Sequence, residues 1–134
     1  MRAAGGTCFT LEKSPLSDLA DTIRQTDHLL DAQPRPTAVF LAHDHLAAGV
    51  IAAATARGLQ VPRDVSVVGF ADLALAALLQ PPLTTVRQDP ETIGRRAAEL
   101  LLRRLMGQAA DDPVRLRLPP ELIVRASTAS PLTE

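Results

Sequence analysis

The feature that most constrains the fold is a regular exchange between short aliphatic runs and longer segments with helical spacing. Residues 37–42 and 65–70 are almost continuously apolar, which is typical of strands covered on both faces of a sheet. Apolar residues in 14–33, 45–57 and 90–106 recur at the helical period, and Pro or Gly residues bound these segments. This alternation predicts an α/β fold: a three-layer domain with a mainly parallel sheet and crossover helices on its faces.

Three further segments complete the expected sheet. Leu83 to Val86 forms a third extended segment after the prolines at 81 and 82. In 114–118, aliphatic residues alternate with Arg, which predicts a half-exposed strand near an edge. Residues 122–124 form the last extended segment.

Aspartate and glycine residues mark the ends of the expected helices. Asp44 and Asp72 each stand where a side chain can cap a following helix, and Asp89 does so before Pro90. Gly58 follows the helix at 45–57, where a left-handed C-terminal cap is favoured. Helices are therefore expected to begin after each of these aspartates.

The charge balance argues against a duplex-binding surface within this chain. There are 14 basic and 15 acidic residues, and the net charge is -1. Duplex-binding domains gain affinity by neutralising phosphates and normally carry a basic excess. The chain has no Trp, no Tyr and only three Phe residues, so an aromatic surface that stacks bases is not expected either.

Neither terminus nor interior shows a targeting or membrane signal. The start, Met1 to Gly6, has no long apolar stretch behind its single Arg, so we do not expect a secretory signal. No apolar run reaches the roughly 18 residues that a membrane-spanning helix needs. The single cysteine, Cys8, cannot form an internal disulfide, which is compatible with a reducing, cytoplasmic setting.

Five stretches in the same order carry a resemblance to the lactose/galactose repressor (LacI/GalR) family of transcriptional regulators. They are Arg-Pro-Thr-Ala-Val-Phe (35–40), Gly-Leu-Gln-Val-Pro-Arg-Asp-Val-Ser-Val-Val-Gly-Phe (58–70), Pro-Leu-Thr-Thr-Val-Arg-Gln (82–88), Ile-Gly-Arg-Arg-Ala (93–97) and Leu-Pro-Pro-Glu-Leu-Ile-Val-Arg-Ala-Ser-Thr (118–128). Together they cover about residues 35 to 129. The resemblance implies the latter half of the effector-binding domain, which has the periplasmic-binding-protein fold of two α/β lobes with the ligand between them.

The resemblance also implies a division of the chain. Residues 7–86 would form the C-terminal lobe, 87–118 a crossover followed by a helix and strand of the N-terminal lobe, and 119–129 the returning strand. The helix at 90–106 would then carry an apolar stripe that faces the other lobe and associates with a partner when uncovered. The family's helix-turn-helix, which reads DNA, is not found in these 134 residues.

By the same resemblance, candidate effector-binding residues are His43, Asp72, Gln88 and Ser17. His43 and Ala71 stand where the family usually has Asn and an acidic residue, so a hexose or purine effector is in doubt. His43 is either a hydrogen-bonding group of the cleft or a solvated loop residue. Asp72 is favoured as a helix cap over a ligand contact. Gln88 either reaches the ligand or the opposite lobe with its amide, or makes a hydrogen bond within the crossover strand.

A homodimer is expected, because the family builds its interface from the helix at 45–57 and the short helix after Asp72. The candidate interface residues are Ala47, Ala48, Ile51, Leu75 and Leu78. The many alanines of the first helix also allow a second helix to approach closely, and we expect sheet packing on its other face.

Catalytic and metal-binding patterns do not emerge from the sequence. His43 and His45 flank Asp44, but adjacent ligands at a helix start do not project together, so no metal site is expected. Cys8 has no paired base and is expected to be a small core residue. No triad, paired carboxylates or glycine-rich phosphate loop is present, so neither an enzyme nor a cofactor is predicted.

The sequence is compatible with three functions. The first is the ligand-sensing and dimerisation portion of a LacI/GalR-like regulator, which contacts DNA only through a domain outside this chain. The second is part of a periplasmic sugar-binding protein of an uptake system, which shares the fold. The third is a degenerate fragment without a ligand. Sequence upstream of Met1, a helix-turn-helix or a signal sequence, separates the first two.

Overall fold

The computed structural model describes residues 19–108 and 114–130, and Ser17 and Cys8 lie outside these ranges. The elements in chain order are α1 (Leu19–Leu30), β1 (Ala38–Phe40), the 3-10 turn η2 (Asp44–Leu46), α2 (Ala47–Ala56), β2 (Ser66–Phe70), α3 (Ala74–Leu78), β3 (Thr84–Arg87), α4 (Pro90–Leu105) and β4 (Glu121–Ile123).

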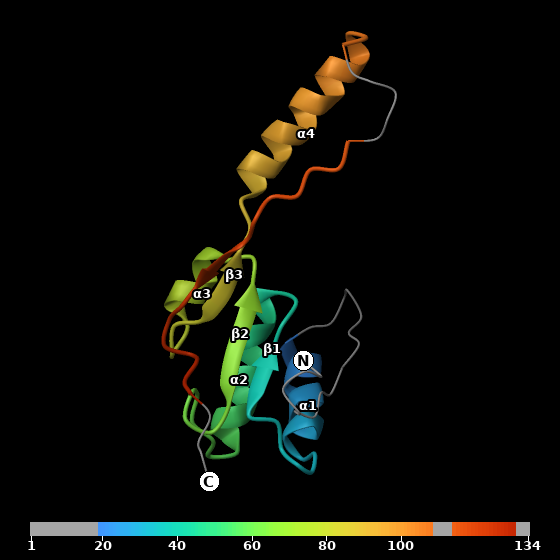
Figure 1. Cartoon of the computed structure of the whole chain (residues 1–134). Helices are drawn as coiled ribbons and strands as arrows, with labels where there is room; N and C mark the ends of the chain where they lie inside the picture. The colour runs from blue at the N-terminus through green and yellow to red at the C-terminus, as the bar shows by residue number, and fades with distance from the viewer. Residues whose placement is uncertain (1–18, 109–113, 131–134) are drawn as a thin grey trace.

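The four strands form one sheet in the order β1-β2-β3-β4. β1 pairs with β2 and β2 with β3 in parallel, whereas β4 runs antiparallel to β3. The predicted α/β class with a mainly parallel sheet is therefore confirmed. Because the first three strands are parallel, their carboxyl ends meet at one edge of the sheet, from which α4 projects (Figure 1).

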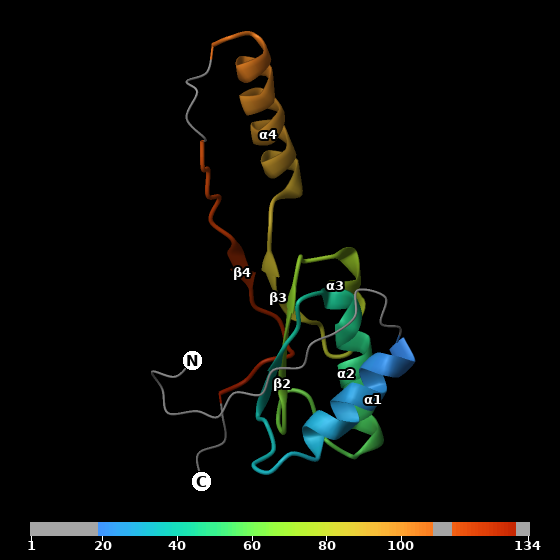
Figure 2. The same ribbon diagram turned by 90° about the vertical axis from the view of Figure 1, so that its right-hand side faces the viewer.

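Helices α1, α2 and α3 lie on the same side of the sheet (Figure 2). Small residues bring α1 and α2 together: a Cβ added at Gly49 would lie only 2.7 Å from the Thr22 methyl group. The predicted close helix approach thus occurs within the chain. The helical spacing of apolar residues in 14–33 indicates only part of the buried face of α1: Leu30 is buried, but so are Thr22 and Thr26, whereas Leu19 is exposed.

The second face of the sheet is open within the described ranges. Val39 of β1 is buried, but Phe40 is 64% exposed and lies edge-to-face against Phe70, with 6.5 Å between ring centroids. Within the described ranges, helices cover one face of the sheet, and the exposure of the other face is greatest at β1.

Two local predictions at chain reversals are confirmed. Gly58 has φ +71, and the Leu59 N–H donates a hydrogen bond to the Ala54 carbonyl at 2.9 Å. α2 therefore ends in the predicted C-terminal cap, with glycine in the left-handed conformation. Asp89 caps α4 by accepting a hydrogen bond from the Thr92 N–H at 2.9 Å. Both interactions join residues close in sequence.

α4 and the segment 114–118 form an arm beyond the sheet (Figures 1 and 2). α4 has no buried residue, and Leu101 and Leu105 on its apolar stripe are exposed. The strand predicted at 114–118 is wrong, because these residues pair with no strand. The last extended segment, predicted at 122–124, corresponds to β4 (Glu121–Ile123). Alternating side chains alone do not make a strand when no neighbouring backbone is available for pairing.

The segment after β4 returns to the sheet through Ser127, which is fully buried. Its hydroxyl donates to the Val67 carbonyl at 2.6 Å and accepts from the Thr84 N–H at 2.8 Å. The Val67 N–H in turn donates to the Ser127 carbonyl at 2.8 Å. These bonds fix the returning chain across β2 and β3.

Candidate functional site

The carboxyl edge of the parallel strands collects most of the polar residues that sequence reasoning singled out. His43 follows β1, Asp72 follows β2 and Gln88 follows β3. In open α/β sheets, ligands bind outside the carboxyl ends of the strands. The topology therefore places three of the four predicted effector residues at the edge where a ligand is expected, and Ser17 lies outside the described ranges.

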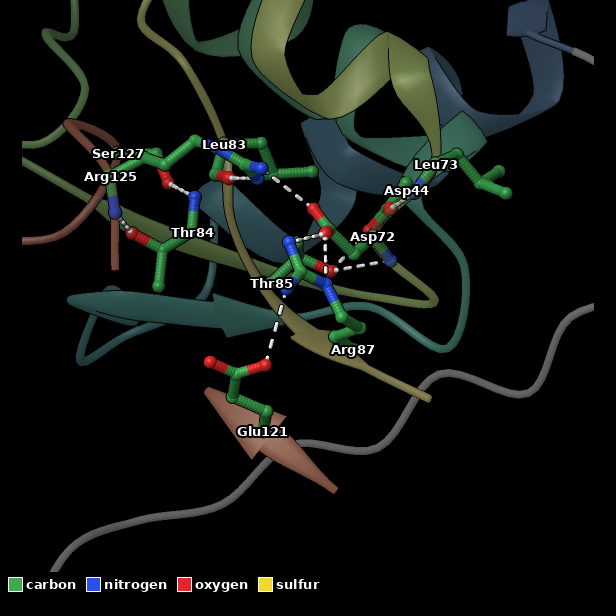
Figure 3. A network of polar contacts seen from close by, with 10 residues as sticks. All are labelled: Asp44, Asp72, Leu73, Leu83, Thr84, Thr85, Arg87, Glu121, Arg125 and Ser127. Atoms are coloured by element: carbon green, nitrogen blue, oxygen red, sulfur yellow. Dashed lines mark hydrogen bonds and ion pairs between the residues drawn. The ribbon is translucent and has the colours of Figure 1, made fainter. Parts of the chain in front are cut away.

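Asp44 is the buried centre of this edge. Its side chain is fully buried; Oδ1 accepts from the Thr85 hydroxyl at 2.7 Å and Oδ2 from the Leu73 N–H at 2.7 Å (Figure 3). The prediction that Asp44 caps the following helix is wrong, because no side-chain cap bond forms there. Its two oxygens instead connect the loop after β1 to the turn after β2 and to β3.

The turn after β2 has an unusual backbone. Ala71 has φ +109 and Asp72 has φ +53, both in the left-handed region that favours glycine. The Ala71 N–H donates a hydrogen bond to the Val86 carbonyl at 2.8 Å, and the Leu73 N–H donates one to the Asp44 carboxyl group. Such conformations persist where surrounding contacts impose them, and they cluster at ligand sites and switch regions.

The Asp72 carboxylate lies between two guanidinium groups (Figure 3). Its Oδ1 is 2.7 Å from Arg125 Nη2, and its Oδ2 is 2.7 Å from both Nε and Nη2 of Arg87. Glu121 of β4 lies 3.2 Å from Arg87 Nη1. The prediction that Asp72 caps a helix is wrong, since Leu73 is the cap residue of α3 and no side chain bonds there.

Arg125 also makes hydrogen bonds to the start of β3 and the residue before it. Its Nη1 donates to the Leu83 carbonyl at 2.8 Å, and its backbone N–H donates to the Thr84 hydroxyl at 2.9 Å. Neither Arg87 nor Arg125 was found by sequence reasoning, although both lie within the stretches that carry the family resemblance. Their partner is 15 and 53 residues away, so no local spacing indicates the pairing.

Ionisation of Asp72 is controlled by these neighbours. Burial disfavours the charged carboxylate, but hydrogen bonds from Arg125 and Arg87 outweigh burial and lower the pKa of Asp72 below its ordinary value. Asp72 is therefore an anion at neutral pH whose oxygens are already occupied by guanidinium groups.

The pH dependence of stability follows from this lowered pKa. Ionised Asp72 stabilises the fold fully above the unfolded pKa of about 4, and the contribution is lost as pH falls below it. At pH 7, the Asp72→Asn variant should therefore unfold at a lower urea concentration than the parent. The difference between the two midpoints should shrink below about pH 4. Urea unfolding followed by circular dichroism measures this; a difference that persists unchanged at pH 2.5 would contradict it.

The other predicted effector residues are solvent-accessible. His43 is exposed and has extended backbone just before the 3-10 turn, and Gln88 is exposed immediately after β3. Arg87 is 47% exposed beside them. The edge therefore offers hydrogen-bond donors to a ligand, while the carboxylates of Asp44 and Asp72 are engaged within the protein.

The predicted dimer residues differ in what they expose. Ala47 is fully buried in the core, so its methyl group cannot contact a partner. The prediction that Ala47 lies in the dimer interface is therefore wrong. Ala48, Ile51 and Leu75 are partly exposed, and Leu78 is 76% exposed. Four of the five predicted interface residues therefore retain some exposed surface.

Within 19–108 and 114–130, His, Cys, Asp and Glu residues form no group of three that could hold a metal ion. Among the helices described, none has the length and apolar character required to cross a bilayer.

Comparisons with known proteins agree with this architecture. The family model of the periplasmic binding protein-like domain matches residues 7–128. The HTH-type transcriptional repressor PurR of Haemophilus influenzae is 38% identical over 106 residues, covering 78% of this chain and 32% of the relative. The HTH-type transcriptional repressor CytR of Escherichia coli is 44% identical over 100 residues, covering 75% and 29%. The chain thus spans about a third of the length of these relatives.

Solved structures give the same result. A LacI-family regulatory protein from Chloroflexus aggregans superposes with TM-score 0.83 at 34% identity, over 96% of this chain and 47% of that one. The regulator CelR in complex with cellobiose gives 0.74 at 38%, over 81% and 33%. The lac repressor dimer bound to operator and an anti-inducer gives 0.74 at 35%, over 84% and 39%.

Fold and comparisons define an α/β domain of the periplasmic binding protein-like type. The chain belongs to that family, and within it to the effector-binding domains of LacI/GalR transcriptional regulators.

Proposed function

We propose that the chain is the effector-sensing and dimerisation portion of a LacI/GalR-type transcriptional regulator, without catalytic activity. A small molecule, a sugar or related compound, would bind at the carboxyl edge of β1, β2 and β3. The observation that carries this proposal is the convergence of His43, Gln88 and the Asp72–Arg87 pair at that edge. Ser17 remains a fourth candidate contact.

The division of the chain expected from the family is part of this proposal. Residues 7–86 would form one lobe, 87–118 the crossover and the arm belonging to a second lobe, and 119–129 the returning strand. The antiparallel pairing of β4 with β3 supports two chain crossings side by side. The exposed apolar stripe of α4 supports cover by a second lobe.

A homodimer would form through α2 and α3, with Ala48, Ile51, Leu75 and Leu78 in its interface. The exposure of Leu78 supports this, as does the dimeric state named for the similar lac repressor structure. Such a regulator would act in the cytoplasm and contact DNA only through a helix-turn-helix domain outside these residues. Effector binding would then favour one dimer arrangement over another.

Thermal-shift measurement with a panel of ligands tests the effector proposal. The panel contains cellobiose, lactose, nucleosides, purine bases and sugar phosphates. A ligand that binds only the folded state raises the melting temperature in proportion to the logarithm of its concentration. At least one compound should do so for the parent, and His43→Ala and Gln88→Ala should reduce the shift.

Thr55→Ala, an exposed change on the distal part of α2, is the matched control and should leave the ligand-induced shift intact. Absence of a shift from every compound in the panel would overturn the proposal. If the ligand raised the melting temperature of both edge variants as much as that of the parent, the ligand would bind at another surface.

A further inference from the structure

Two strands carry the chain between the sheet and the arm. β3 leads out to α4, and β4 leads back, and the two lie side by side (Figure 1). Arg87 is the last residue of β3, and Arg125 follows β4 by two residues. Both guanidinium groups bond to one carboxylate, that of Asp72, at 2.7 Å.

Asp72 is also directly connected to α3. Leu73 is the cap residue of that helix, and α3 begins at Ala74. The Ala71–Asp72 backbone is left-handed without glycine, so its shape depends on the contacts that hold it. Those contacts reach the Val86 carbonyl and Asp44, and the Asp72 side chain reaches Arg87 and Arg125.

α3 itself has few other attachments. It contains five residues, of which only Ala76 is buried, and the Ala76 carbonyl accepts from the Leu83 N–H at 2.8 Å. Leu78, at its end, is exposed. Apart from the turn that begins it, α3 is held by Ala76 in the hydrophobic core and by Leu79, which packs against that core, so a change at the turn reaches a helix with few other contacts.

We propose that Asp72 is a positioning residue that transmits the placement of the two strands leading to the arm to helix α3, through its ion pairs with Arg87 and Arg125. This inference rests on the proposed function, in which the arm belongs to the second lobe and α3 to the dimer interface. Movement of the lobes displaces the two guanidinium groups, and the turn at 71–73 carries this displacement into α3. Asp72 therefore acts through its neighbours and need not touch the effector.

Hydrogen exchange of the full 134-residue chain, read by mass spectrometry, tests the inference. In Asp72→Asn and in Arg87→Gln, amides of 73–79 should exchange at least ten-fold faster than in the parent. Amides of α1 should change less than two-fold. Glu121→Gln removes the other acidic partner of Arg87 but leaves Asp72 in place, so it is the matched control and should leave 73–79 within two-fold of the parent.

Each outcome bears on the claim. Unchanged exchange at 73–79 in Arg87→Gln overturns it, even if Asp72→Asn does not fold. Equal acceleration in Glu121→Gln, or uniform acceleration of α1 and α3, also overturns it, because the effect would then be general loosening. The exchange readout needs neither ligand nor dimer, so failure of the proposed function would show separately, as an absence of ligand-induced thermal shifts.

Discussion

Gly69→Ala is expected to destabilise the chain more than any other single methyl addition considered. A Cβ at this position would overlap the Asp44 Oδ1 atom and lie 2.7 Å from the Leu83 Cδ2 atom, and both residues are fully buried. Overpacking of a core costs about 1–3 kcal/mol, and displacement of a buried carboxylate from its donors adds to this. We expect a loss of about 3 kcal/mol or more in the free energy of unfolding.

Gly94→Ala is the matched control, because a Cβ there meets nothing within 4 Å and the residue lies inside α4. Alanine should stabilise that helix by about 0.5–1 kcal/mol. Urea unfolding followed by circular dichroism suits both variants, since the chain has no Trp or Tyr to report by fluorescence. A Gly69→Ala variant as stable as the parent would mean that Asp44 does not lie beneath β2.

Asp44→Ala should produce the second large effect. The substitution leaves the Leu73 N–H and the Thr85 hydroxyl without their acceptor in a buried site. Because each buried donor left without a partner costs about 1–3 kcal/mol, we expect a loss of about 3–4 kcal/mol in the free energy of unfolding. Thr85→Val removes one of the two donors and should cost less than Asp44→Ala.

Asp31→Ala provides the surface comparison, because that carboxylate pairs with Arg57 while 63% exposed. Exposed ion pairs contribute little to stability, so this variant should unfold close to the parent. If Asp44→Ala and Asp31→Ala shifted the unfolding midpoint equally, Asp44 would not be the buried junction of the edge.

Features that depend on residues close together in the sequence were predicted better than features that depend on distant residues. The helix end at Gly58 and the cap at Asp89 depend on residues within five positions, and both were predicted correctly. The α/β class with a mainly parallel sheet also followed from the alternation of strands and helices, whereas the order of the strands in the sheet was not predicted.

Long-range polar contacts were the part that sequence could not supply. Asp44 and Asp72 each precede a helix, which locally indicates a cap, but their partners are Thr85, 41 residues from Asp44, and Arg125, 53 residues from Asp72. A carboxylate that serves a distant donor has the same local sequence as one that caps a helix. The burial of Thr22 in α1 was likewise missed, because it depends on the approach of Gly49.

The most direct test of the central claim is an amide chemical-shift titration of the 134-residue chain with the same ligand panel. If a small molecule binds at the carboxyl edge of β1, β2 and β3, as proposed, at least one compound should cause saturable shifts centred on residues 42–44, 70–73 and 86–88. Saturable shifts centred on α1 or α4 instead, or none from any compound, would contradict the proposal.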